Sequence, residues 1–198
     1  MVMIISNREE WLNAATTHLK IYVFMPAGFD VPDDVKVSCG WPVSGGRPSS
    51  RKTTIGQCFS RELSKASINE IFISPSQNDS VKVLDILAHE LIHAIDDCQN
   101  GHKGPFKRIA VAIGLEGKMT STVAGDELKA KLEKIVEDIG DYPHKEIDLT
   151  TRKKQSTRNI KVECSVCGFN WRASKAMISR MTNNTCNGCG SDTLTLSN

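Results

Sequence analysis

The sequence predicts an α+β fold over residues 1–150 and a small cysteine-rich domain over residues 160–198. Three observations support this organisation. Segments with apolar residues at helical spacing lie among short segments that are typical of β-strands. Four cysteines form two Cys-x-x-Cys pairs near the C-terminus. Between these regions, residues 151–159 are polar and basic and contain no apolar side chain, which is typical of a linker between domains.

The expected elements of the first domain follow from spacing and from start and stop signals. The first helix places four apolar side chains on one face, namely Trp11, Leu12, Ala15 and Leu19. The clearest strand, residues 69–74, is rich in apolar β-formers and is stopped by a proline. Asp79 or Ser80 can cap a helix over residues 81–98. In order, we expect a helix over 8–18, strands over 35–41, 54–60 and 69–74, and helices over 81–98, 105–113 and 126–139.

The clearest chemical signal is His89-Glu90-x-x-His93, which lies inside the expected helix over residues 81–98. Side chains four residues apart on a helix have Cβ atoms roughly 5–6 Å apart. His89 and His93 can therefore bind one zinc ion through two imidazole nitrogens. Glu90 projects to one side and can accept a proton from a water at the metal, whose pKa zinc lowers from about 15.7 towards 7. The alternative, two surface histidines, does not explain the apolar residues around the motif.

A catalytic zinc ion usually has three protein ligands and a water, so the motif needs one more ligand. His102 is the best candidate, because it follows Gly101, where the helix is expected to have ended and the chain can turn back. Glu116 is the alternative, as a downstream carboxylate that would complete a His₂Glu site. Asp96, three residues after His93, is instead placed to hydrogen-bond to a ligand imidazole.

A resemblance to a known family rests on the same region. In His89-Glu-Leu-Ile-His93 followed by Gly101-His102-Lys-Gly-Pro-Phe106, the chain resembles the SprT-like family, which includes the DNA-repair protease Spartan. The resemblance covers roughly residues 8–115 and the C-terminal cysteines. It implies a zincin-like metallopeptidase domain over residues 1–150, in which His89, His93 and His102 bind zinc and Glu90 is the catalytic base. One departure is Lys103, because the family often has Gly directly after the third histidine.

The resemblance also bears on the expected strand over residues 69–74. In zincins a strand in this position borders the active-site cleft, and an exposed strand edge can pair with an extended peptide. The apolar content of the segment is equally compatible with an interior strand. Both interpretations stay open from the sequence.

The two cysteine pairs predict a second metal site. Cys164-x-x-Cys167 and Cys186-x-x-Cys189 are separated by 18 residues, which is typical of two knuckles that close a tetrahedral Cys₄ zinc site. A domain of about 40 residues has too small a core to be stable alone, and a structural zinc supplies the missing stabilisation. We therefore expect a zinc ribbon over residues 160–198 and two zinc ions, one catalytic and one structural. The other cysteines are expected to be small buried side chains: Cys39, Cys58 and Cys98.

Charge is distributed unevenly along the chain. Residues 1–150 hold 17 Lys and Arg against 21 Asp and Glu, whereas residues 151–198 hold 8 against 2. A basic domain of this kind suits a nucleic-acid partner. Cations near an aromatic side chain suit single-stranded or distorted DNA, with Trp171 stacked on a base, although Trp171 suits the small core of the ribbon equally well. The expected nucleic-acid-binding residues are Arg152, Lys153, Lys154, Arg158, Trp171, Arg172 and Lys175.

These patterns predict a zinc metallopeptidase of the HExxH type that hydrolyses peptide bonds, and the resemblance implies that its substrates are DNA-associated proteins. The alternative is a zinc-containing nucleic-acid-binding or transcription-associated factor with little or no protease activity. Glu90 argues against it, because a structural metal site needs no general base. Paired cysteines and the lack of a secretory signal predict a cytoplasmic or nucleoid-associated protein that is not secreted. No apolar run approaches the roughly 20 residues of a membrane span, so no membrane partner is expected.

Overall fold

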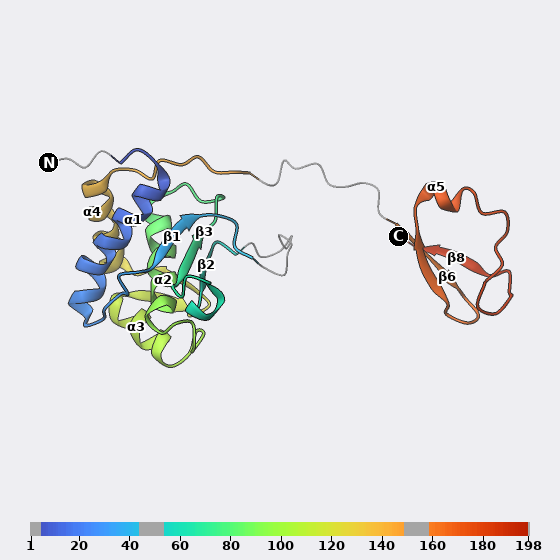
Figure 1. Cartoon of the computed structure of the whole chain (residues 1–198), viewed down its shortest axis with the longest axis horizontal. Helices are drawn as coiled ribbons and strands as arrows, with labels where there is room; N and C mark the ends of the chain where they lie inside the picture. Colours follow the sequence, from blue (N-terminus) through green and yellow to red (C-terminus); the bar gives the residue numbers. More distant parts are fainter. Residues whose placement is uncertain (1–4, 44–53, 149–158, 198) are drawn as a thin grey trace. The chain divides into compact units, whose positions relative to one another are not determined.

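A computed structural model describes residues 5–43, 54–148 and 159–197 of the chain (Figure 1). The chain divides into two compact units, Met1–Leu149 and Thr150–Asn198. Helices and small sheets occur in the first unit and strands with one short helix in the second, so the α+β class is confirmed. Of the expected linker over residues 151–159, all but the last residue lies outside the described residues. Within the described ranges no helix has the length and apolar character needed to cross a membrane.

The sheet of the first unit has three strands in the order β1-β3-β2, where β1 is Lys36–Cys39, β2 is Gly56–Phe59 and β3 is Glu70–Ile73. The middle strand, β3, runs parallel to β1 and antiparallel to β2. Its residues Ile71 and Ile73 are buried in the core. The interior interpretation of residues 69–74 is therefore correct and the edge interpretation is wrong. Within the described residues, β2 is an edge strand of this sheet, and it packs against the helix Ser80–Ile95.

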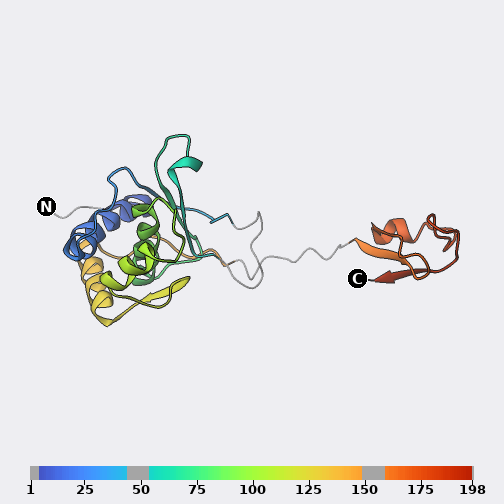
Figure 2. The same cartoon turned by 90° about the horizontal axis from the view of Figure 1, so that it is seen from below.

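Three helices pack together beside this sheet: α1 (Arg8–Leu19), α2 (Ser80–Ile95) and α4 (Asp126–Ile139). Figures 1 and 2 show α1 and α4 side by side on one side of the sheet. The indole N–H of Trp11 in α1 donates to the carbonyl oxygen of Gly140 at the end of α4, at 2.8 Å. After α1 the chain continues through a π-helical turn, Lys20–Phe24, and a 3₁₀ turn, Met25–Ala27.

Helix α2 is the central helix of the core. Asp79 caps the N-terminus of α2. Its side chain accepts a hydrogen bond from the backbone N–H of Lys82 at 2.7 Å, which satisfies one of the free N–H groups of the first turn. The sequence predicts a helix as far as Cys98, but α2 ends at Ile95. Asp97 and Cys98 adopt left-handed φ angles of 51° and 59°, which no helix can continue through. The buried residues of α2 are Val83, Leu84, Asp85, Ile86, Leu87, Ala88, Glu90, Leu91, Ile92 and Ala94.

A hairpin that the sequence did not predict follows the next helix. Helix α3 (Pro105–Ile113) ends at Gly114, which has a left-handed φ of 92° that favours glycine. Strands β4 (Leu115–Lys118) and β5 (Ser121–Ala124) then pair antiparallel as a two-stranded sheet. A 3₁₀ turn, Arg61–Leu63, lies between β2 and β3. The hairpin matters because β5 forms one wall of the site that is described below.

The second unit is a three-stranded antiparallel sheet with the order β7-β6-β8. Its elements are β6 (Ile160–Cys164), β7 (Asn170–Ala173), the short helix α5 (Lys175–Ile178) and β8 (Leu194–Ser197). Among its described residues, the buried hydrophobic side chains are Val162, Cys164, Ala173 and Cys186. This core is very small, and half of it consists of cysteines from the predicted metal site.

Candidate metal centres

Three histidines converge in the first unit. His89 and His93 lie one turn apart on α2, and His102 comes from the loop that follows it. The Nε2 atom of His102 lies 3.2 Å from Nε2 of His89 and 3.3 Å from Nε2 of His93. Nitrogen bonds of about 2.0–2.1 Å to a tetrahedral ion place two ligand nitrogens about 3.3–3.4 Å apart. The three imidazoles therefore have the spacing that one metal ion requires.

The loop after α2 brings His102 back to the helix. The backbone N–H of Cys98 donates to the carbonyl oxygen of His93 at 2.8 Å, which closes the first turn of the loop. Gly101 and Gly104 have φ angles of 52° and 43°, in the left-handed region that glycine adopts without strain. The inserted Lys103 lies between these two glycines and does not displace His102 from the cluster.

Phe106, the first large side chain of α3, packs against all three imidazoles. The ring centroid of Phe106 lies 4.9 Å from that of His89, 4.6 Å from that of His93 and 4.9 Å from that of His102. Its side chain is fully buried. Burial lowers the pKa of His89 to about 3 and that of His93 to about 4. Both imidazoles are therefore neutral near pH 7 and have a lone pair available for a metal ion.

The outer nitrogen of His89 is fixed by a residue that the sequence did not point to. Nδ1 of His89 lies 2.8 Å from Oγ1 of Thr122, a buried side chain on β5. In the tautomer that leaves Nε2 free for a metal, Nδ1–H donates to this hydroxyl, which orients the ring.

The prediction that Asp96 hydrogen-bonds to a ligand imidazole is wrong. Both carboxylate oxygens of Asp96 are buried, and neither has a hydrogen-bond partner among the residues that the structure describes.

Glu116, the alternative third ligand, lies elsewhere. It belongs to β4, is exposed, and extends over Gly125 at the start of α4. A Cβ atom at Gly125 would come within 2.5 Å of its Oε1 atom, so the carboxylate lies directly over the glycine. Within the described residues, the metal-competent group contains His89, His93 and His102 and does not include Glu116.

Glu90 is buried beside the histidines and is fixed by β2. Only 7% of its surface is exposed, and the backbone N–H of Cys58 donates to its carboxylate. Burial raises the pKa of Glu90 to about 8, and the hydrogen bond from Cys58 acts in the opposite direction. A dication bound by the neighbouring imidazoles would lower this pKa again. A Cβ atom at Gly56 would lie 2.7 Å from Oε1 of Glu90, so only glycine allows β2 to approach this closely.

These groups line a cleft of about 850 Å³. Strand β2 forms one wall, strand β5 forms the other, and α2 forms the floor with His89, Glu90 and His93. The charged side chains at its rim include Lys82, whose Nζ atom lies 2.6 Å from the buried carboxylate of Asp85. The arrangement can bind a metal ion and place a carboxylate beside it, at a cleft that is open to solvent.

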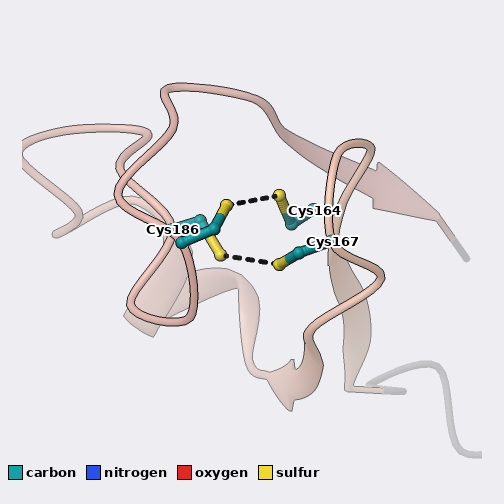
Figure 3. A group of neighbouring side chains, drawn as sticks. Cys164, Cys167 and Cys186 are labelled. Atoms are coloured by element: carbon teal, nitrogen blue, oxygen red, sulfur yellow. Dashed lines mark hydrogen bonds between the residues drawn. The ribbon is translucent and has the colours of Figure 1, made fainter.

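Four cysteines converge in the second unit, and Figure 3 shows the sulfurs of Cys164 and Cys167 facing those of the other pair. Sγ of Cys164 lies 3.7 Å from Sγ of Cys189, and Sγ of Cys167 lies 3.6 Å from Sγ of Cys186. Metal–sulfur bonds of about 2.3 Å at tetrahedral angles place two sulfurs about 3.8 Å apart. The spacing therefore fits a Cys₄ metal site.

The surroundings of Cys164 favour its thiolate form. The hydroxyls of Ser191 and Thr193 lie 3.4 Å and 3.3 Å from Sγ of Cys164, and their hydrogen bonds lower the pKa of this thiol to about 5. The backbone N–H of Gly188 donates to Sγ of Cys186 at 3.3 Å. Donors of this kind stabilise the charged sulfurs that a metal ion requires.

The predicted nucleic-acid-binding residues are only partly described. Arg172 and Lys175 are exposed. Trp171 is half-buried, lies opposite the buried Val162 in the strand register and lines a hollow of about 320 Å³ with residues that follow α5. Successive residues of a strand point to opposite faces, so Trp171 and Arg172 do not share a surface. The other predicted residues lie outside the described residues: Arg152, Lys153, Lys154 and Arg158.

The two centres thus combine different donor sets with different surroundings. The first has three neutral nitrogens, a buried carboxylate and an open cleft, whereas the second has four sulfurs that enclose one point.

Comparisons of the chain with models of protein families, with curated proteins and with solved structures each gave no match.

Proposed function

We propose that this chain is a zinc metallopeptidase with a zincin-like first unit, related to the SprT-like family. The observation that carries the proposal is the position of Glu90, whose carboxylate is buried beside three convergent imidazoles and lines an open cleft. A structural zinc site has four protein ligands and no adjacent base, whereas a catalytic site has three ligands and one open position. The motif from His89 to Phe106 supports the family assignment.

Each residue of the site has its own role in the proposed peptide hydrolysis. When bound, zinc would polarise the scissile carbonyl and lower the pKa of the attacking water. Glu90 accepts the proton of that water and then donates it to the amine that leaves. The N–H of Cys58 donates to the Glu90 carboxylate and fixes its orientation. Thr122 and Phe106 fix the imidazoles, so that little reorganisation accompanies the reaction.

The walls of the cleft support a polypeptide substrate. Within the described residues, β5 pairs only with β4 and presents an unpaired strand edge at the cleft. On β2 the backbone N–H and carbonyl of Cys58 already bond to Glu90 and to the Cys98 thiol. Main-chain N–H and C=O groups on an unpaired edge such as that of β5 pair with an extended peptide of almost any sequence. A hydrolase of small molecules has no need of a strand edge at its site.

The charge of the second unit supports substrates that are associated with DNA. Arg172, Lys175 and Arg180 are exposed and form no ion pair with any residue that the structure describes. Unpaired cations are available to neutralise phosphates. The same charges would serve the alternative function, a nucleic-acid-binding factor with little protease activity, so the test has to measure both cleavage and binding.

The decisive test uses the full-length, zinc-loaded chain with one protein substrate in two forms, free and crosslinked to single-stranded DNA. Wild type is expected to cleave both, and the DNA-linked form faster. Glu90→Gln should reduce turnover about 10²–10⁴-fold, because the amide cannot accept a proton. Glu137→Gln, on the exposed face of α4, is the matched control and should match wild type.

Zinc content and DNA affinity are measured on the same samples. Unchanged zinc content in Glu90→Gln would separate loss of the base from loss of the metal. Wild-type turnover in Glu90→Gln would show that Glu90 is not the base. Tight DNA binding without cleavage of either substrate by wild type would replace the peptidase proposal with the alternative function.

A further inference from the structure

Two cysteines that are 40 residues apart meet at the wall of the cleft. Cys58 lies in β2, and Cys98 lies in the left-handed turn that follows α2. Sγ of Cys98 lies 3.6 Å from the carbonyl oxygen of Cys58. A hydrogen bond to the Cys98 thiol and burial raise the pKa of the Cys58 thiol. The expectation that Cys39, Cys58 and Cys98 are buried side chains is therefore wrong, because each is half-buried. Cys58 and Cys98 also lie next to each other.

Both thiols can be reached from solvent through the cleft. Cys58 and Cys98 are among its lining residues, together with Glu90 and His93. Cys39 is equally half-buried, but it lies on β1 and does not line the cleft. Thiols that are adjacent and open to a small oxidant convert to a disulfide more readily than isolated ones, because the second thiol is already in place.

We propose that Cys58 and Cys98 form a reversible disulfide in response to a hydroperoxide, and that this site of oxidation controls the cleft. One thiol attacks the peroxide, so its sulfur becomes a sulfenic acid and the first water, or the alcohol of an organic hydroperoxide, leaves. The second thiol then attacks that sulfur, the S–S bond forms and a water leaves. Two thiols are oxidised by two electrons in all, and the O–O bond is reduced. A dithiol such as dithiothreitol reverses the change by exchange.

The disulfide would act on Glu90 through β2. Disulfide sulfurs are about 2.05 Å apart, closer than two hydrogen-bonded thiols, so β2 and the turn after α2 have to approach each other. The N–H of Cys58 fixes the Glu90 carboxylate, and Gly56 contacts it closely from the same strand. A displacement of about 1 Å at a catalytic group costs about 10²-fold in rate. This loss of turnover rests on the proposed peptidase function, whereas formation of the disulfide does not.

The site is tested by chemical mapping of the full-length, zinc-loaded chain. The protein is treated with hydrogen peroxide, its remaining thiols are blocked with N-ethylmaleimide, and trypsin is added. Lys and Arg residues between the three cysteines place Cys39, Cys58 and Cys98 on separate peptides. We expect the peptides of Cys58 and Cys98 to be joined, two hydrogens lighter than their sum, and to separate with dithiothreitol. Cys98→Ser should lose this product, and the matched control Cys39→Ser should keep it.

Separate recovery of Cys58 and Cys98, either blocked or oxidised to sulfinic acids, would overturn the proposal whether or not the chain is a peptidase. Turnover is measured next. Peroxide should lower wild-type turnover about 10²-fold and dithiothreitol should restore it, whereas the turnover of Cys98→Ser should be the same before and after peroxide. A joined peptide pair with unchanged turnover would establish the oxidation site and overturn its control of the cleft. If wild type has no turnover at all, the peptide map still decides the site.

Discussion

The two candidate metal centres have similar ligand spacing and opposite relations to their surroundings. In the first unit, His89 and His93 lie on a buried helix inside a core that extends from Trp11 to Tyr142, and His102 lies in the loop that follows this helix. In the second unit, Cys164 and Cys186 are themselves half of the buried hydrophobic side chains among the described residues. The first unit can therefore fold before it binds a metal ion, whereas the second needs the ion to complete its core.

The two centres also differ in how open they are to solvent. The His centre faces a cleft of about 850 Å³, so a substrate and a water can reach a metal ion there. The Cys centre supplies four donors, which fill a tetrahedral shell and leave no position for a substrate. The buried Glu90 occurs only beside the open centre, which is where a base has a use.

The largest expected effect comes from removing one ligand at each centre. Cys186→Ser should unfold the second unit, because structural zinc contributes an apparent binding free energy of about 10–16 kcal/mol, more than this core supplies. His102→Ala should leave the first unit folded and lower the metal content by one ion. Backbone amide NMR spectra and elemental analysis measure both outcomes. Dispersed signals from the second unit in Cys186→Ser would show that this unit folds without a complete Cys centre. Two bound ions in His102→Ala would show that His102 is not required to hold the metal ion.

A second prediction concerns the approach of β2 to Glu90. Gly56→Ala should displace the carboxylate and reduce turnover about 10²-fold without loss of metal, since the new Cβ would lie 2.7 Å from Oε1 of Glu90 and 2.6 Å from Cγ2 of Ile86 on the same helix. Gly40→Ala is the matched control. Its Cβ would lie 2.6 Å from the side chain of Phe72, in the same sheet but away from the cleft. Equal losses of turnover in the two variants would mean that the sheet as a whole is disturbed and that Gly56 has no special role.

The smallest expected effect is on metal affinity. Thr122→Val removes the hydroxyl that accepts from Nδ1 of His89 and keeps the shape of the side chain. Loss of such an orienting partner typically weakens metal binding 10–100-fold. Competition with a chelator measures the affinity of the His centre, and Thr120→Val, an exposed change on the same hairpin, is the control. The metal affinity of the Cys centre should be unaffected. An unchanged affinity of the His centre would show that Thr122 does not contribute to metal binding there.

Spacing along the chain was enough for the local parts of both centres. His89 and His93 are four residues apart on a helix that could be expected from its cap and apolar pattern, and the cysteine pairs define knuckles by themselves. The sequence-based predictions were wrong where the structure depends on contacts between distant segments. The edge position could not be assigned to residues 69–74, because the order of strands depends on pairing between segments. The hairpin of β4 and β5 was missed, because its short strands contain little alternation.

The sequence by itself identified His89, Glu90, His93 and the four paired cysteines as candidates, since helical periodicity and fixed Cys-x-x-Cys spacing are properties of nearby residues. Only the tertiary structure decided their partners. Thr122 reaches His89 from 33 residues away, and Cys98 meets Cys58 only after the chain has turned back from α2. Contacts of this kind leave no periodic pattern in the sequence, because packing creates them after the local elements have formed.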